Sequence, residues 1–510
     1  MEKRLILAIA LSLLVLLTWS VFVSKSYHID NKEVINKESG LQQPVIKPRS
    51  LKIESKTPPV HFSENDKDLV LSTEKLRIDF DEPAAAIKDV IFKDYRSHRV
   101  VLKYGLAIDD PEAVFKNELL TDKEAVFVYS GRELQISKHF LFDNSNYSIE
   151  LEIEILNKSS HAINTSIGLI PAILDFSKRG NLPNYQDITV ALSGNILHPN
   201  PRKDASWNNI KFMGWRERYF CEILEPTTSS YSLNLARLNP SETQPVLRSP
   251  AFSLAPGERI SQKFHIYMGP QDLNMIKNVN SEWSAIVYYG IFDFIAQILL
   301  KFLGIIYIVV HNWGLAIILL SISIYLILYP LTLKQMHSMK AMQLLQPRIE
   351  ELRANYKDNP QRLNKEIMEL YRKHKVNPFG GCLPMILQIP IFFALYQVLM
   401  RSPALKGAEF LWIKDLSEPD RLITLSYKLP FLGNEINILP ILMAIAMFVQ
   451  QKISSRSMSS ASAEQQKLML IIFPVMFGFI FYRMPSGLVL YWFVNSSLMM
   501  AQQLLINRAK

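Results

Sequence analysis

Residues 313–334 read WGLAIILLSISIYLILYPLTLK, and this stretch decides what kind of protein the chain forms. It holds no charged residue before Lys334, its last position. An α-helix crosses the hydrocarbon core of a bilayer with about 20 mostly apolar residues. Proline lacks the backbone N–H that a helix interior uses. The stretch therefore predicts a transmembrane span over 311–330 that ends at Pro330.

Apolar stretches on both sides predict further spans. Lys3 and Arg4 precede a mostly apolar run from Leu5 to Val23 without a convincing cleavage site, so 1–24 is interpreted as an uncleaved transmembrane anchor. Four more spans are predicted within 379–510, at 384–399, 436–450, 468–482 and 488–505. The predicted fold class is thus a membrane α-helical bundle of six spans, several of them short enough to thin the bilayer around them.

The segment 281–310, just before the second span, is apolar and aromatic but interrupted by polar residues. Asp293, Gln297 and Lys301 are four residues apart and therefore share one helical face. A helix with one polar stripe is typical of the membrane interface. We expect 281–310 to form an interfacial amphipathic helix rather than a span.

The region between the anchor and this helix is predicted to be soluble. Residues 25–60 are polar and are interpreted as a flexible linker. From 61 to 280 the pattern alternates, most clearly at 147–155, where YSIELEIEI puts every glutamate on one face. Such strands, separated by turn-forming residues, predict an all-β sandwich domain.

The loop charges predict the orientation of the spans. Residues 333–377 hold ten basic residues against five acidic ones, whereas 400–437 hold five of each. Loops rich in Lys and Arg usually stay in the cytoplasm. We therefore expect both termini and the loop 331–378 in the cytoplasm, with the β domain outside. The net charge of +9 is explained by these loops, so nucleic acid is not an expected partner.

The cytoplasmic loop 331–378 is predicted to be a helical hairpin. Apolar residues, Met339 and Met342 among them, recur every three or four positions, and Asn359-Pro360 supplies the turn. Pro347 is expected to kink the first helix. Two interpretations stay open: a solvated helical loop, or a methionine-rich docking surface for varied hydrophobic partners.

Polar residues occur within three of the predicted spans, where they are costly. They include Ser321, Tyr325, Gln388, Tyr396, Asn495 and Ser496, with Gln502 near the end of the last span. For any single residue a hydrogen bond between helices is a sufficient explanation. Together they can line a hydrophilic groove. No Asp, Glu, Lys or Arg lies deep in a span, unlike most proton-coupled transporters.

Nothing in the sequence predicts an enzyme. We find no phosphate loop, no metal-ligand cluster and no nucleophile with a matching base, so neither a cofactor nor a small-molecule substrate is expected. The two cysteines, Cys221 and Cys382, fall in different predicted regions, so no disulfide between them is expected.

Several short motifs follow one another in the membrane part. They are Tyr329-Pro-Leu-Thr332, Val376-Asn-Pro-Phe-Gly-Gly-Cys-Leu-Pro384, Gln388-Ile-Pro-Ile-Phe392, Leu411-Trp-Ile-Lys-Asp-Leu416 and Pro485-Ser-Gly-Leu-Val-Leu-Tyr-Trp492. In this order and spacing they closely resemble the YidC membrane protein insertases, over about 289–509. The large outer β domain resembles the Gram-negative type, in which that domain is periplasmic.

The resemblance implies a five-helix core with a hydrophilic groove in the inner membrane. Such proteins help nascent membrane proteins insert and fold, alone or with the Sec translocon, and they receive substrates from the ribosome. By carry-over, Ile389, Phe392, Tyr491 and Trp492 form an apolar slide that contacts the passing helix, and the hairpin receives substrates. Tyr325 is a departure, because the family usually carries an arginine there. We therefore expect a groove that works by hydration and hydrogen bonding.

Two alternatives belong to other classes of protein. A multi-spanning solute transporter with an outer β domain is suggested by the polar residues in the spans, but no inverted repeat is detectable. A membrane-anchored carbohydrate-binding or carbohydrate-modifying protein is suggested by the β-sandwich. That alternative needs paired carboxylates or an aromatic platform in the sandwich.

Overall fold

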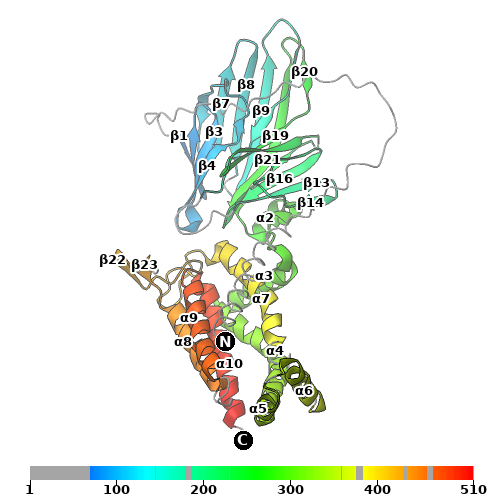
Figure 1. Ribbon diagram of the computed structural model, residues 1–510. Coiled ribbons are helices and arrows are strands. Elements are labelled where there is room, and N and C mark those ends of the chain that lie inside the picture. The colour runs from blue at the N-terminus through cyan, green and yellow to red at the C-terminus, as the bar shows by residue number, and fades with distance from the viewer. Residues whose placement is uncertain are drawn as a thin grey trace, which may run out of the picture. The chain divides into compact units, whose positions relative to one another are not determined.

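The computed structural model describes residues 69–143, 145–177, 186–228, 230–357, 359–374, 383–429, 433–455 and 463–508. The predicted anchor 1–24, the linker 25–60 and Cys382 lie outside these residues. The chain divides into two compact units, Met1–Tyr288 and Tyr289–Lys510, each of which is described by itself (Figure 1). The first is β-rich and the second is helical, as the sequence predicts.

The first unit contains three main sheets and one small strand pair. The nine-stranded sheet runs in the order β14 (Asn195–Leu197), β13 (Asp187–Leu192), β16 (Ile210–Arg216), β17 (Phe220–Pro226), β21 (Arg259–Pro270), β9 (Ser148–Asn157), β8 (Leu134–Phe142), β7 (Glu124–Ser130) and β6 (Lys116–Leu120). The four-stranded sheet is β1 (Leu69–Ser72), β2 (Leu76–Asp81), β3 (Ala86–Phe92) and β4 (His98–Gly105). The six-stranded sheet is β15 (Ala205–Trp207), β18 (Ser232–Asn239), β19 (Glu242–Arg248), β11 (Gly168–Ile170) and β5 (Ala107–Ile108), with β12 (Leu174–Asp175) also paired to β19. The remaining elements are the pair β10 (Ile163–Thr165) and β20 (Phe252–Leu254), the short helices η1 (Lys93–Tyr95) and η2 (Ser281–Ile286), and α2 (Leu273–Val279).

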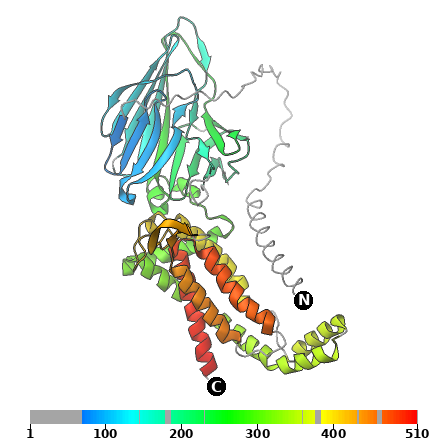
Figure 2. The ribbon, with the colours of Figure 1, turned by 60° about the vertical axis from the view of Figure 1, so that its left-hand side comes forward.

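The three sheets form two layers (Figure 2). One face of the nine-stranded sheet is apolar, because alternate residues of β9 such as Leu151 point inward while the glutamates between them point outward. Phe140 and Phe264 pair with Leu151 on this face. Phe80 of the four-stranded sheet packs 5.5 Å from Phe140, and Tyr231, next to β18, packs 5.5 Å from Phe264, between ring centroids. Both smaller sheets therefore cover the same face.

A buried lysine ties these layers together. Lys138 of β8 has no exposed surface, and its ammonium donates hydrogen bonds to the carbonyl oxygens of Ala85 and Leu106. Both acceptor residues have a left-handed backbone, with φ of 45° and 60°. Such a backbone is unfavourable for residues with a side chain, so the lysine stabilises two strained turns. Burial lowers the pKa of Lys138 to about 7.

The second unit is mostly helical. Its elements are η3 (Gly290–Phe292), α3 (Asp293–Val310), α4 (Trp313–Leu344), α5 (Gln346–Asn355), α6 (Pro360–Lys373), α7 (Leu383–Arg401), η5 (Pro403–Leu405), the ribbon β22 (Ile423–Leu429) and β23 (Gly433–Ile436), α8 (Leu439–Ser455), α9 (Ala463–Phe481) and α10 (Ser486–Arg508). Helix α10 packs against α4 and α8, α8 packs against α9, and α3 packs against α4 and α7.

Pro330 and Pro347 were predicted to end one helix and to kink another, and the structure shows where the helices are in fact interrupted. The helix predicted to end at Pro330 continues as α4 to Leu344. Prolines are tolerated inside helices of membrane proteins, where neighbouring helices and local adjustments satisfy the freed backbone. Two residues beyond Pro330, the Thr332 hydroxyl donates to the carbonyl of Tyr329 at 2.9 Å. The predicted first helix of the hairpin is interrupted just before Pro347, because α4 ends at Leu344 and α5 begins at Gln346. Pro347 lies in the first turn of α5, where its missing N–H costs no intrahelical hydrogen bond.

The ribbon β22–β23 was not predicted, and it changes where the next helix begins. Ile436 belongs to β23, so α8 starts at Leu439 rather than at 436. Within the described residues, two helical segments have the length and hydropathy to cross a membrane, Gly290–Val310 and Trp313–Lys334. Leu439–Ile453 and Leu470–Phe481 are apolar but shorter.

Candidate functional site

A buried polar cluster joins α4 to α10. The Tyr325 hydroxyl donates to Oε1 of Gln502 at 2.7 Å, and Nε2 of Gln502 lies 3.5 Å from the Thr332 hydroxyl. All three side chains are less than a tenth exposed. The ring of Tyr329 stands edge-on to that of Tyr325, with centroids 6.1 Å apart. The sequence placed Tyr325 among the groove residues, and the structure supplies its partners.

A second polar contact joins α7 to α10. The side-chain amide of Gln388 donates a short hydrogen bond to the hydroxyl of Tyr491, which is fully buried. Gln388 itself is half-buried. The two predicted residues from different spans are thus direct partners.

Aromatic side chains surround this second contact. The ring of Phe392 lies 5.2 Å from that of Trp492 and 5.8 Å from that of Phe481, between centroids. Phe477 stacks 5.7 Å from Trp492. The cluster therefore brings together α7, α9 and α10, and it leaves Ile389 41% exposed on α7, one turn before Phe393.

The other predicted groove residues are placed as follows. Tyr396 stacks on Phe392 with centroids 6.5 Å apart. Ser321 is fully buried and donates to the carbonyl of Ile317 in its own helix at 2.7 Å, the common way in which a helix accommodates a serine. Ser496 is buried and Asn495 is half-buried on α10. Ser321 therefore has a local role in α4, unlike Tyr325 and Gln388, which bridge helices.

The predicted hairpin 331–378 falls on the end of α4, on α5 and on α6, and α5 and α6 pack against each other. Pro360 is in the first turn of α6, and Oδ1 of Asn359 caps that helix by accepting from the backbone N–H of Arg362 at 3.1 Å. Met342 is half-buried near the end of α4. Met339 belongs to the same helix, and its side chain lies outside the described part of the structure.

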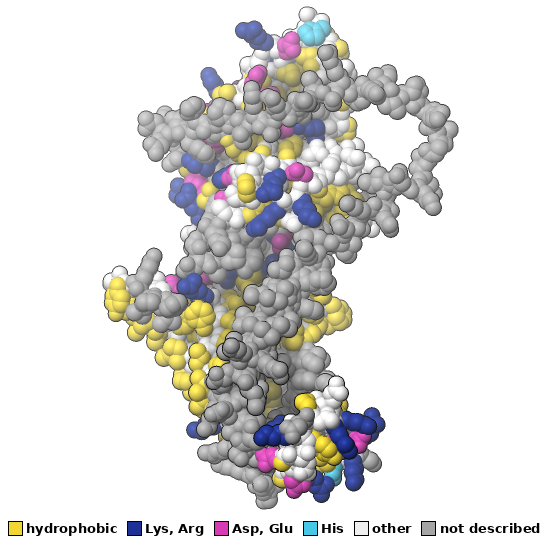
Figure 3. All heavy atoms as spheres, viewed as in Figure 1, with side chains coloured by type: hydrophobic (Ala, Val, Ile, Leu, Met, Phe, Trp, Pro, Cys, Tyr) yellow, Lys and Arg dark blue, Asp and Glu magenta, His cyan; other side chains and the backbone are white. Residues whose placement is uncertain are grey.

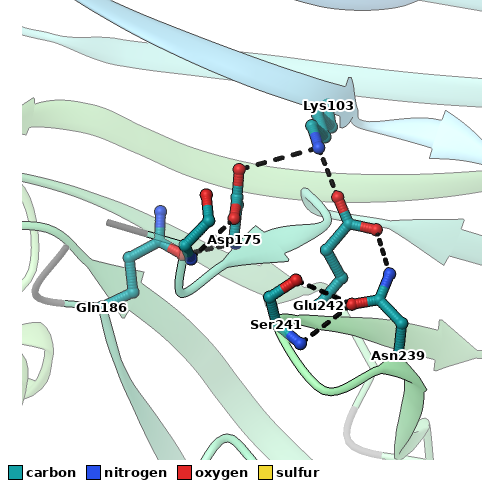
Figure 4. Close-up of polar contacts among 7 residues, drawn as sticks. Lys103, Asp175, Gln186, Asn239, Ser241 and Glu242 are labelled. Carbon is teal, nitrogen blue, oxygen red and sulfur yellow. Dashed lines mark hydrogen bonds and ion pairs between the residues drawn. The ribbon is translucent and has the colours of Figure 1, made fainter. Parts of the chain in front are cut away.

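The β domain contains a polar cluster that bears on the carbohydrate alternative (Figure 4). Asp175 and Glu242 are cross-strand partners on β12 and β19. The ammonium of Lys103 lies 3.6 Å from the Asp175 carboxylate and forms a short ion pair with Glu242. A cation between two carboxylates neutralises them and links β4 to β12 and β19, which is a structural role. Among the described residues, no three His, Cys, Asp or Glu side chains are grouped to hold a metal ion.

Four residues of these clusters were missed as site residues by the sequence analysis. Phe477 and Phe481 come from α9, and with Phe473 they follow one another at intervals of four. That spacing is a helical stripe and could have been recognised. Gln502 is a polar residue near the end of the predicted span 488–505, which is the signal that also identified Tyr325, but this signal does not name its partner. Thr332 carries no comparable signal.

Comparison with known proteins agrees with the two-unit architecture. The family model described as "60Kd inner membrane protein" matches residues 305–510, and the one described as "YidC periplasmic domain" matches residues 110–302. A membrane protein insertase YidC from Geotalea uraniireducens is 32% identical over 546 residues, covering 100% of this chain and 99% of that protein. One from Syntrophobacter fumaroxidans is 35% identical over 420 residues, covering 78% and 73%. A crystal structure titled as an active YidC insertase with its first transmembrane domain resolved has a TM-score of 0.42 and 22% identity, covering 86% of this chain and 93% of that one.

These matches define a membrane protein with a periplasmic β-rich domain followed by a helical membrane region. The chain belongs to the YidC family of membrane protein insertases. The resemblance found in the sequence motifs is therefore confirmed, and the family is one of insertases rather than of enzymes.

Proposed function

We propose that this chain inserts nascent membrane proteins into the inner membrane and assists their folding through a hydrophilic path beside α4, α7 and α10. The observation that carries this proposal is the pair of polar contacts between helices, Tyr325–Gln502 and Gln388–Tyr491. Both lie in helices whose predicted spans are mostly apolar. Polar groups at bilayer depth are costly and usually functional. Here α4 and α7 each contribute one such group, and each group bonds to a side chain of α10.

The physical basis is a shorter dry path for the substrate. Each unsatisfied or charged group that crosses lipid costs several kcal/mol, so a polar path lowers the barrier for a hydrophilic tail. The apolar parts of α8 and α9 are short, Leu439–Ile453 and Leu470–Phe481, and short helices thin the bilayer. The emerging span then leaves sideways into lipid, which needs no ATP.

The topology we propose has six spans with both termini and the hairpin α5–α6 in the cytoplasm. The basic surplus of 333–377 supports this orientation. The same orientation supports our proposal for α3, although Gly290–Val310 is long and apolar enough to cross a membrane. Because the β domain and the beginning of α4 then lie on the same side of the membrane, the helix between them lies at the interface instead of crossing. The polar stripe of Asp293, Gln297 and Lys301 fits that position.

The residues proposed to contact the passing helix are Ile389, Phe392, Tyr491 and Trp492. Ile389 supports this role because it is 41% exposed beside the aromatic cluster. We further propose the Sec translocon and the ribosome as partners, with the hairpin α5–α6 receiving substrates. The transporter alternative finds no support among the relatives, which are named as insertases.

Site-specific photocrosslinking tests the proposed path. A photoreactive amino acid at position 389 is expected to crosslink a stalled nascent membrane protein in the full-length chain. The matched control is position 327, because Ile327 is 71% exposed on α4 and is expected to face lipid. Equal crosslinking from 389 and 327, or crosslinking from 327 alone, would place the substrate elsewhere and contradict the proposal.

A further inference from the structure

The connection between α7 and α8, residues 402–438, closes one end of the helical unit. It is hydrogen-bonded to the beginning of α10, where the backbone N–H of Gly487 donates to the carbonyl of Leu416 at 2.9 Å. It is bonded to the end of α9, where the amide of Asn437 donates to the carbonyl of Tyr482 at 2.7 Å. It also touches the beginning of α4, because Phe410 packs against Gly314 so closely that no Cβ fits there.

The base of this connection is fixed by charged and polar groups. Asp420 is 2% exposed and accepts hydrogen bonds from the backbone N–H groups of Ile438 and Leu439, both at 2.9 Å, at the beginning of α8. Arg421 forms ion pairs with Glu418 and Glu435, at 3.3 and 3.0 Å. The ribbon β22–β23 extends from this base.

In contrast with its base, the outer part of the connection exposes large apolar side chains. Leu411 is 76% exposed, Leu422 41%, Ile423 50% and Tyr427 63%. Hydrophobic side chains gather over the ribbon and over the helices beside it (Figure 3). Leu411 also has a left-handed backbone, with φ of 52°, which is unfavourable for a residue with a side chain. The exposed leucine side chain is therefore held by a strained backbone.

The ribbon has one apolar and one polar face near its base. Ile423 pairs with Ile436 on one face, and Thr424 pairs with Glu435 on the other. An isolated two-stranded ribbon is only marginally stable in water and needs a surface that covers its apolar face.

We propose that Leu411, Ile423 and Tyr427 are embedded in the interfacial layer of the bilayer in which this protein sits. The connection is then a membrane-surface anchor at the outer ends of the helices. The inference goes beyond insertion itself and rests on the proposed topology only for which side of the membrane is involved.

Continuity with the lipid-facing surface identifies lipid as the occupant. Helix α8 follows the ribbon directly, and its first turns expose Ile441 by 46% and Ile445 by 54%. Exposed apolar side chains thus occur both on the first turns of the helix and on the ribbon. Tyrosine is typical of the interface, where its ring contacts acyl chains and its hydroxyl contacts water. Such an anchor holds the end of the short helix α8 at the lipid surface.

Depth-dependent fluorescence quenching tests the anchor in the full-length chain in vesicles. Single cysteines are introduced as Ile423→Cys and, as the matched control on the polar face, Thr424→Cys, each carrying a polarity-sensitive dye. Cys382→Ser removes one native thiol, while Cys221 stays because it is buried. The chain without an added cysteine must take up no dye, and Tyr427→Cys provides a second reporter.

The dye at 423 and at 427 is expected to be quenched several-fold more by nitroxide lipids labelled near the glycerol level than the dye at 424. Aqueous iodide is expected to show the reverse order. Equal iodide quenching at 423 and 424 overturns the anchor. A dye at 423 that is shielded from both quenchers also overturns the anchor, because the residue would then be covered by protein, either the β domain or a second copy.

Insertion assayed on the same vesicles separates this proposal from the proposed function. Vesicles that are active in insertion but show no lipid quenching at 423 count against the anchor alone.

Discussion

The hydroxyl of Tyr325 donates a 2.7 Å hydrogen bond to Oε1 of Gln502, which joins α4 to α10 in the interior of the helical unit. Where the sequence resemblance implies an arginine, this chain has a neutral contact between tyrosine and glutamine. Gln502 also approaches Thr332, at 3.5 Å. The tyrosine is therefore part of a small polar network and not an isolated substitution.

Removing the hydroxyl tests this network. Tyr325→Phe leaves the amide oxygen of Gln502 buried without its donor, which costs about 1–3 kcal/mol of stability. Thermal unfolding of the full-length protein in detergent measures the loss, with Tyr329→Phe as the control because Tyr329 is 39% exposed. In a double-mutant cycle with Gln502→Met, the second substitution is expected to cost less when Tyr325 is already Phe. Strict additivity would show that the two side chains do not interact.

Restoring the charge tests how the path treats acidic substrates. Tyr325→Arg is expected to favour insertion of substrates with acidic tails and to change neutral tails little, because an arginine attracts a carboxylate in a low-dielectric site. Protease protection of matched acidic and neutral tails measures the ratio. The same change for both tails would mean that charge at position 325 does not select substrates.

Lys138 predicts a pH dependence of the β domain. Its pKa is about 7 in the folded protein against 10.5 when exposed, so the unfolded chain binds more protons between these pH values. The contribution of Lys138 to the free energy of unfolding therefore rises with pH in this window, by up to about 1.4 kcal/mol per pH unit.

Lys138→Met removes that contribution and leaves the carbonyls of Ala85 and Leu106 unpaired. Denaturant titrations at pH 7.5 and 9, read by protease cleavage within 69–288, are expected to show a smaller pH slope in the variant. Glu222, whose burial raises its pKa to about 8, is present in both proteins, so its effect cancels. An unchanged slope would mean that Lys138 stays charged in the fold.

Deleting most of the β domain separates insertion from the carbohydrate alternative. Because 1–288 and 289–510 are separate compact units, removal of 69–280 is expected to leave insertion largely intact. A shorter chain that is folded and membrane-embedded but inactive would assign the main activity to the β domain instead.

Strict local patterns were the most reliable guide to the fold. The alternation at 147–155 predicted β9, and the apolar run before Pro330 predicted a helix there. The predicted end of that helix at Pro330 was wrong, because a helix tolerates proline where other groups satisfy the backbone. The ribbon β22–β23 was missed although residues 423–429 alternate, since the segment stands between two predicted spans and was interpreted as loop.

The sequence could predict which polar residues belong to the candidate site, but not which residue each of them contacts. Polar residues in apolar spans identified Tyr325 and Gln388, but which residue each one meets depends on how α4, α7 and α10 pack. Gln502 is 177 positions from Tyr325, so no local pattern connects them. Likewise, Phe477 and Phe481 join Trp492 only through the packing of α9 beside α10.

Insertion by the purified full-length protein in liposomes tests the central claim most directly. A small single-span protein with a short outer tail is synthesised in the presence of these liposomes, without Sec components and without added ATP beyond that needed for synthesis. We expect its tail to be protected from protease well above the level of empty liposomes. Protection no higher than in empty liposomes, while a related insertase works alongside, would contradict autonomous insertion by this chain.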